Sequence, residues 1–157
     1  MELTLNQIID RVRTLALSHK QIESFVLLKE TVDSYLSNGD ITYPCVLCDL
    51  TDGGGIDRST RQVSIPVRLF FLDSEKLVDD SQGNTLEIWS DRILVAQDFI
   101  AMLMKQSNTE EYRDWRIDGG SQLAFYSEKF SDYVAGVSVD ITIRLPYEVN
   151  RCQAPIE

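Results

Sequence analysis

The clearest pattern of hydrophobic and polar positions lies near the end of the chain, from Gly136 to Leu145. Aliphatic residues take every second position there and polar residues the positions between: Val137, Val139, Ile141, Ile143 and Leu145 alternate with Ser138, Asp140, Thr142 and Arg144. Because successive side chains of a strand point to opposite faces, this pattern predicts an inner strand with one apolar face. We expect the strand to begin at Gly136 and to end at Pro146, which has no N–H to donate.

The beginning of the chain has helical spacing instead. Thr4 and Gln7 are spaced as in a capping box, where the hydroxyl accepts from a free backbone N–H and the glutamine side chain reaches back. Apolar residues then recur at intervals of three and four: Leu5, Ile8, Ile9, Val12, Leu15 and Ala16. This pattern predicts an amphipathic helix that ends near Ser18 to Lys20 and lies across the apolar face of the sheet.

Two apolar segments in the middle of the chain predict a β-hairpin over residues 45–72. Cys45–Leu50 is a short apolar run, and Arg61–Asp73 alternates as a strand does. Between them, Thr51–Thr60 contains three consecutive glycines, which lose much backbone freedom on ordering, so we expect a mobile hairpin tip. Pro66 lacks an N–H for the ladder, which places that side of its strand at a sheet edge or a bulge.

The longest predicted element is a helix from Thr85 to about Gln106. Its apolar residues form two stripes: Leu86, Trp89, Ile93, Ala96, Ile100 and Leu103 in the first, and Ile88, Leu94, Val95, Phe99 and Met102 in the second. A helix that is apolar on two sides is either sandwiched or covered by another subunit. We expect the first stripe to pack on the sheet and the second, with Ile88 and Val95, to face a neighbouring subunit.

Shorter segments complete the predicted order of elements. Residues 22–28 are ambiguous between a strand and an extended link, and residues 32–36 fit one helical turn. Further strands are predicted at residues 115–117, 122–127 and 133–145. We therefore expect a single α+β domain over residues 1–146, with two main helices on a mixed or antiparallel sheet, and an irregular arm over residues 147–157.

Charge and cysteine content narrow the classes of function. The chain has 157 residues and a formal net charge of −10, and acidic surfaces repel the phosphates of nucleic acids and anionic membranes. Neither a membrane-spanning segment nor a signal peptide is expected, because no apolar run is long enough and a helical pattern opens the chain. The three cysteines, Cys45, Cys48 and Cys152, are expected to be free thiols in a reducing cytoplasm.

Cys45 and Cys48 have a spacing that also occurs in metal and redox sites. Residues three apart on a strand face opposite ways, however, and no second pair of cysteines or histidines completes a tetrahedral site. A redox cysteine is activated at the start of a helix, whereas this segment predicts a strand. We therefore interpret both as buried structural thiols. His19, the only histidine, is expected to contact the C-terminal end of the first helix.

Acidic residues and glycines near the predicted hairpin tip raise two further possibilities for a site. Asp49, Asp52 and Asp57 are candidate ligands for Mg²⁺ or Ca²⁺, but their spacing does not match an EF-hand loop. Gly53–Gly55 is a candidate phosphate cradle, but the Gly-Lys-Ser/Thr of a phosphate loop does not follow it. We interpret the segment as a flexible tip with solvated charge, and expect no metal and no cofactor.

Several short segments, spread over most of the chain, carry a resemblance to a known family: Leu3–Ile9, Arg11–Arg13, Ser18–Phe25, Tyr43–Pro44, Ile56–Ser59, Val134–Val137 and Arg151–Pro155. In these segments the chain resembles virion neck proteins of crAss-like and related tailed bacteriophages. The predicted order of elements is also similar to that of tail-terminator and tail-completion proteins, small α+β subunits that close into rings where head and tail meet.

This resemblance implies a structural virion protein without an active site, made in the host cytoplasm. It implies a sixfold or twelvefold ring that contacts other neck and tail proteins, and through which DNA passes without specific binding. The hairpin tip and the arm are expected to order only in this assembly. The predicted interface residues are Ile88, Val95, Gly53, Gly54, Gly55, Ile56, Arg58, Arg151 and Pro155. A small intracellular adaptor or regulatory domain and a carboxylate-dependent metal hydrolase remain as alternatives.

Overall fold

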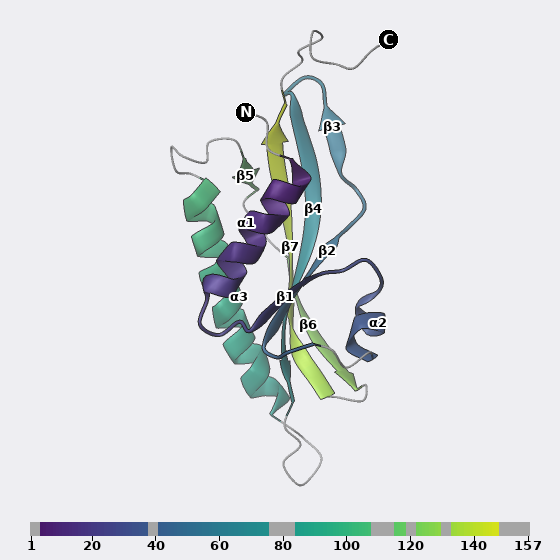
Figure 1. Ribbon diagram of the computed structural model, residues 1–157, viewed down its shortest axis with the longest axis vertical. Helices are drawn as coiled ribbons and strands as arrows, with labels where there is room; N and C mark the ends of the chain where they lie inside the picture. Colours follow the sequence, from purple (N-terminus) through teal and green to yellow (C-terminus); the bar gives the residue numbers. More distant parts are fainter. Residues whose placement is uncertain are drawn as a thin grey trace.

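The structure, a computed structural model, describes residues 4–37, 41–75, 84–107, 115–118, 122–129 and 133–147. Within these residues a mixed seven-stranded sheet is packed by helices, which confirms the predicted α+β class (Figure 1). The helices are α1 (Leu5–Ser18), α2 (Val32–Ser37) and α3 (Thr85–Ser107). The strands are β1 (Ser24–Leu27), β2 (Cys45–Leu50), β3 (Gly55–Asp57), β4 (Gln62–Ser74), β5 (Arg116–Ile117), β6 (Gln122–Lys129) and β7 (Tyr133–Pro146).

β4 and β7 form the spine of the sheet. All 13 residues of β4 pair with β7, from Gln62 opposite Pro146 to Ser74 opposite Val134. At one end of this pair, β2 and then β1 extend the sheet beyond β4, and β6 extends it beyond β7. At the other end β3 pairs with β4 and β5 pairs with β7. Among the described strands, only β1 and β2 pair in parallel. The presence of β1 shows that the ambiguous residues 22–28 contain a strand.

The alternation along the two central strands separates two hydrophobic clusters. The larger lies under α1 and α3 and includes Ile8, Val12, Val46, Val67, Leu69, Phe71, Val95, Phe99, Val137, Val139, Ile141 and Ile143. The smaller lies on the other face, under α2, and consists of Leu28, Leu36, Cys45, Leu47, Phe70, Leu72 and Val134. The predicted apolar face of β7 is therefore confirmed, and its first residues contribute to a second core as well.

Gly136 lies inside β7 and does not mark its beginning. The strand starts at Tyr133, and Gly136 is paired with Leu72 on one side and with Tyr126 on the other. A Cβ atom added to Gly136 would lie 2.9 Å from the Cα atom of Leu72 and would also overlap the carbonyl oxygen of Phe71. Glycine is therefore required here by the close approach of the β4 backbone. The expectation that Gly136 marks the beginning of the strand was wrong, whereas the start predicted at residue 133 is confirmed.

α1 has the boundaries that its sequence predicts. The Gln7 backbone N–H donates to the Thr4 hydroxyl over 3.4 Å, and the Thr4 N–H donates to the Gln7 side-chain carbonyl over 2.9 Å. These two bonds are the predicted capping box. At the other end His19 is the C-cap residue, and its backbone N–H donates to the carbonyl of Ala16 over 3.0 Å.

The hairpin tip is more regular than its glycines predict. Within Thr51–Thr60, β3 begins at Gly55 and pairs with β4. Asp57 Oδ1 then accepts from the hydroxyl of Ser59 over 2.7 Å and from the backbone N–H groups of Ser59 and Thr60 over 2.8 and 3.2 Å. The hydrogen bonds from the Ser59 and Thr60 side chains and backbone hold the pKa of Asp57 below its ordinary value. The tip thus makes hydrogen bonds of its own within the chain, and the expectation that it orders only on assembly stays a prediction.

Pro66 lies where the strand beside β4 is broken. β2 ends opposite Val67 and β3 begins opposite Ser64, so no strand residue pairs with Pro66 on that side. The Pro66 carbonyl accepts from the backbone N–H of Thr51 over 3.2 Å. A Cβ on Gly54 would lie 3.1 Å from Cδ of Pro66, the carbon bonded to its nitrogen. The N–H that proline lacks would therefore point into the break, as a proline at a bulge requires.

Candidate subunit interface

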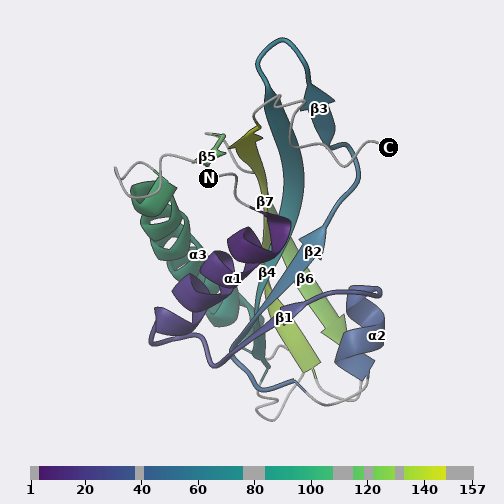
Figure 2. The same ribbon diagram turned by 45° about the horizontal axis from the view of Figure 1, so that its top comes forward.

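The inward side of α3 belongs to the interior of the subunit. Ile88 and Val95, which were predicted to face a neighbouring subunit, are only 5% and 1% exposed. The physical reason is that two elements cover α3: the central strands lie under it and α1 crosses beside it (Figure 2). Both adjoining sides of the helix thereby become core. The assignment of Ile88 and Val95 to an interface was therefore wrong.

α3 nevertheless presents apolar side chains on a third side. Leu86, Leu94 and Met104 are exposed there, although each is a large hydrophobic residue. On the adjacent strand β6, Leu123 and Phe125 are 45% and 58% exposed. Apolar residues gathered on two neighbouring elements are typical of a surface that another molecule covers. We call these five residues the exposed apolar surface.

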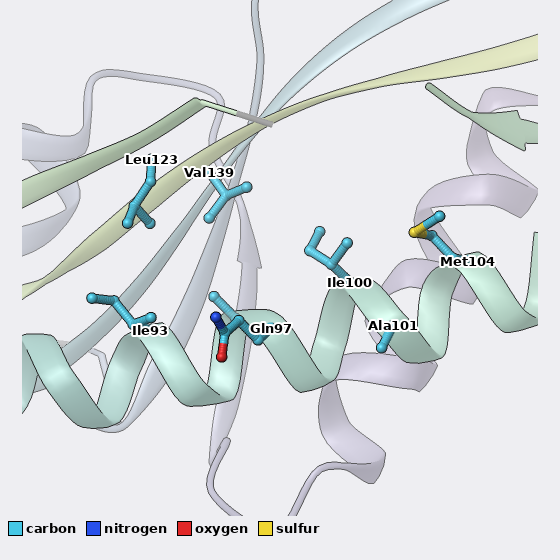
Figure 3. Close-up of a pocket in the computed structure, with 8 residues that line it drawn as sticks. Ile93, Gln97, Ile100, Ala101, Met104, Leu123 and Val139 are labelled. Atoms are coloured by element: carbon cyan, nitrogen blue, oxygen red, sulfur yellow. The ribbon is translucent and has the colours of Figure 1, made fainter. Parts of the chain in front are cut away.

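An apolar groove of about 380 Å³ runs along this surface between α3 and β6. Its lining comes from successive turns of the helix and from two strands: Ile93, Ala96, Gln97, Ile100, Ala101 and Met104 of α3, Leu123 of β6 and Val139 of β7. In Figure 3, Leu123 and Val139 point from the strands toward the row of helix side chains, among which Gln97 is the polar one. The groove therefore offers an apolar floor with a single amide side chain.

Trp89 fixes the position of α3 against β6 at one end of the groove. Its indole N–H donates to the backbone carbonyl of Tyr126 over 3.0 Å, and its ring centre lies 5.0 Å from that of Phe125. Ile93, one turn further along α3, is the first helix residue that lines the groove. The aromatic contact and the hydrogen bond together fix the distance between α3 and β6 at this end of the groove.

β6 is an edge strand in the part of the chain that the structure describes. It pairs with β7 and with no other strand there. The outer side of an edge strand presents backbone N–H and C=O groups that can pair with another chain, unless charges or a bulge protect it. Leu123 and Phe125 are apolar instead, and they point to the same face as α3, because they pair with Val139 and Val137.

The residues considered for metal and redox chemistry have structural surroundings. Cys45 and Cys48 are free thiols, buried in the smaller and the larger hydrophobic cluster respectively, on opposite faces of the sheet. Burial raises the pKa of each thiol to about 12, with a smaller effect from a neighbouring carboxylate. His19 Nδ1 accepts from the backbone N–H of Gln21 over 3.2 Å, and its Nε2 lies 3.7 Å from a carboxylate oxygen of Asp98 on α3.

In the part of the chain that the structure describes, the hairpin residues considered for metal and phosphate binding are not arranged as a metal site or as a phosphate loop. Among the described residues no three His, Cys, Asp or Glu side chains, those of Asp49, Asp52 and Asp57 included, are grouped closely enough to hold a metal ion. Gly53–Gly55 leads into strand β3, whereas a phosphate loop leads into a helix N-terminus. Gly53 has a φ of +98°, which explains a glycine at that position.

The other predicted interface residues fall into two groups. One group lies exposed on the hairpin tip: Gly53, Gly54, Gly55, Ile56 and Arg58. Ile56 is the large hydrophobic residue of this group, and it is 71% exposed. Arg151 and Pro155, like Cys152, lie outside the described residues. Tyr147, the last described residue, ties the end of β7 to the tip: its N–H donates to the Arg61 carbonyl over 3.0 Å and its hydroxyl to the Asp57 carbonyl over 3.2 Å.

Sequence reasoning missed Leu123, Phe125 and Met104. The signal for the strand residues was present, because Leu123 and Phe125 alternate with polar or small neighbours in a predicted strand. What the pattern does not contain is the position of that strand at an edge of the sheet, which leaves its apolar face only partly covered.

No described helix is both long and apolar enough to cross a lipid bilayer. A scan of the chain against models of protein families found no match, and neither did a search of curated proteins.

Proposed function

We propose that this protein is a structural subunit of a ring in the neck of a tailed bacteriophage, where it joins the portal or its adaptor to the tail. The observation that carries the proposal is the exposed apolar surface between α3 and β6. A lone subunit leaves these side chains in water, whereas a neighbouring subunit would bury them at a gain of about 25 cal/mol per Å² of apolar area. Assembly into a multi-subunit structure is therefore favoured.

The arrangement of the subunit favours a ring over a symmetric pair. The apolar groove lies between α3 and β6. β3 and the adjoining end of β4 project at the end of the sheet away from β6 (Figure 1). Contact between two different surfaces of identical subunits is head-to-tail, and it closes into a ring when the rotation between copies divides the circle. A sixfold or twelvefold ring fits the resemblance to neck proteins.

Its place at the junction of head and tail is supported by the sequence resemblance and by charge. With a formal net charge of −10, the subunit suits a channel through which DNA slides, because acidic walls repel the phosphate backbone. In this role the protein acts by shape and contact, without a cofactor and without a catalytic step.

Mass measurement of the native assembly tests the proposal. The purified protein, alone and together with the proteins of the same phage neck, should form particles of six or twelve copies. Averaged electron micrographs should show a ring with a central channel. A protein that stays monomeric both alone and with these partners would contradict the ring function.

A small intracellular adaptor domain is the second candidate, and the same groove favours it. An apolar groove beside an edge strand also accepts a strand or helix of an unrelated protein. Stoichiometry separates the two functions, because an adaptor binds its partner in a one-to-one complex. A monomer that captures one cellular partner would favour the adaptor.

A further inference from the structure

We propose that a second copy of this chain occupies the groove: β3 of one subunit adds to the free edge of β6 of the next, and Ile56 enters the groove between α3 and β6. This inference rests on the proposed ring and names the contact that builds it. It follows from two free strand edges, from the face on which their apolar residues lie, and from strand direction.

The accepting side is the edge of β6. A strand that adds to an edge lies about 4.8 Å from it, and its alternate side chains point to one face of the enlarged sheet. On the α3 face of β6 those side chains would meet Leu123 and, beyond it, the helix residues Ile93 and Ile100. The groove is therefore placed to receive an apolar residue from an added strand.

The donating side is β3, a free edge at the end of the β4–β7 pair away from β6. Among the described strands it pairs with β4 alone, and Figure 2 shows it projecting with the end of β4 beyond the helices. Ile56 is its middle residue and is 71% exposed. Ile56 lies opposite Val63, which packs on the cluster under α1 and α3, so Ile56 faces the same side of the sheet as Leu123.

One subunit cannot make this contact with itself. β3 lies on the outer side of β4, and β6 lies on the outer side of β7, at opposite ends of that central pair. The two edges point away from each other, so β6 can receive β3 only from a second copy. The contact is head-to-tail, and its repetition generates a ring or an open filament.

Strand direction agrees with this pairing. β3 is antiparallel to β4, β4 to β7, and β7 to β6, so direction alternates across the four strands. A neighbour in the same orientation therefore presents its β3 antiparallel to β6. Antiparallel pairing is slightly more stable per residue than parallel pairing.

β1 and the two-residue β5 are the other edge strands among the described residues, and β1 fits the donor role less well than β3. Its four residues are all partly buried, and the guanidinium of Arg13 lies over the ring of Phe25, 5.5 Å from its centre. β1 therefore offers no exposed apolar side chain comparable to Ile56.

Disulfide trapping between two proteins that each carry one introduced cysteine tests the contact. One protein carries Ile56→Cys and the other Leu123→Cys or Phe125→Cys, all in a Cys152→Ser background. Leu123 and Phe125 are both tried because they are two residues apart on one face, and a disulfide requires Cβ atoms about 3.5 to 4.5 Å apart. Native Cys45 and Cys48 are buried, and burial raises the pKa of each to about 12, so they should not compete. Diamide serves as the oxidant.

The expected result is a covalent dimer in the mixture that contains Ile56→Cys with one of the β6 variants. A mixture of Ile56→Cys with Leu17→Cys, an exposed position on α1, is the matched control and should give at least tenfold less dimer. In parallel, Ile56→Asp should reduce assembly measured by sedimentation at least tenfold, whereas Leu17→Asp should not.

The outcomes separate this contact from the proposed function. Rings that form in wild-type protein and in Ile56→Asp, without trapping at either β6 position, would overturn the contact and leave the ring function standing. Trapping in an open filament or a dimer, with no closed ring in the presence of the neck proteins, would support the contact and contradict the ring. A wild-type monomer under all conditions would overturn both.

Discussion

Arg68 and Asp140 lie directly opposite each other on β4 and β7, joined by two hydrogen bonds. Arg68 donates from Nε to Oδ1 over 2.6 Å and from Nη2 to Oδ2 over 3.0 Å, and these bonds raise the pKa of the arginine. The pair lies on the face of the sheet opposite α3. A shift of the pairing by one residue would turn every side chain to the other face, so the pair favours the observed register.

Removing the charge of Asp140 should therefore destabilise the subunit only modestly. The two side chains are 43% and 39% exposed, and water weakens such pairs, so Asp140→Asn should lower the free energy of unfolding by roughly 0.5 to 1 kcal/mol. Asp10→Asn, which removes an exposed pair with Arg13 on α1, is the control and should cost less. Urea denaturation of both variants measures the difference, and equal losses would contradict the role given to Asp140.

Gly136→Ala should be far more harmful than the same change at Gly55. The added Cβ at Gly136 meets the backbone of Leu72 at 2.9 Å, and two paired strands cannot separate without losing hydrogen bonds. We expect a loss of about 1 to 3 kcal/mol, as for other overpacked sites. At Gly55 nothing lies within 4 Å of the added atom, so the free energy of unfolding should change little. Thermal unfolding of the two variants provides the comparison.

Adjacent positions on α3 should respond in opposite ways to a charge. Val95→Asp buries an unpaired carboxylate in the core and should destabilise the fold by about 3 to 5 kcal/mol. Leu94→Asp places the same group in water, because Leu94 is 59% exposed, and should leave the fold intact. Circular dichroism and urea denaturation of the monomeric proteins distinguish them. A folded, stable Val95→Asp protein would show that the interior assignment of this residue is wrong.

The buried thiols predict a loss of stability at high pH. The pKa of Cys45 and of Cys48 is raised from 9.0 to about 12 in the folded protein, so above pH 9 the unfolded chain releases protons that the folded one keeps. The unfolded state then binds fewer protons, and the free energy of unfolding falls as the pH rises from 9 to 12. Below pH 9 these thiols should cause no such slope.

Two measurements check this prediction. In Cys152→Ser protein, Ellman's reagent at pH 8 should label neither remaining thiol in the folded state and both in guanidinium. Cys48→Ala should reduce the steepness of the stability loss between pH 9 and 12. Rapid labelling of the folded protein at pH 8 would contradict the burial of these residues.

The elements with a long, consistent pattern were predictable from the sequence. β7 alternates over ten residues and α1 begins with a capping box, so local physics alone determines their type and most of their boundaries. β3 was missed because it has three residues and begins with a glycine, so its pairing depends on the neighbouring strand rather than on its own propensity. Gly136 was misread because the close approach of β4 is a tertiary contact.

The sequence predicted that α3 has an extra apolar surface, but not which residues form it. Two apolar stripes on α3 correctly indicated that the helix has more apolar surface than one contact with a sheet requires. Which stripe is buried depends on where α1 crosses and on the position of β6 at the sheet edge, and neither follows from periodicity. Ile88 and Val95 were therefore assigned to the wrong side, and Leu123 was missed.

Because β4 pairs with β7 along its whole length, the projecting end and the packed core share one continuous ladder. In a ring built through β3, a pull between neighbours runs along β4 and loads that ladder in shear, so its hydrogen bonds must fail together rather than one after another. The break beside Pro66 leaves β2 outside this line of force. In the proposed ring, β4 and β7 would therefore carry the tension between neighbours, while the packing under α1 and α3 would stay unloaded.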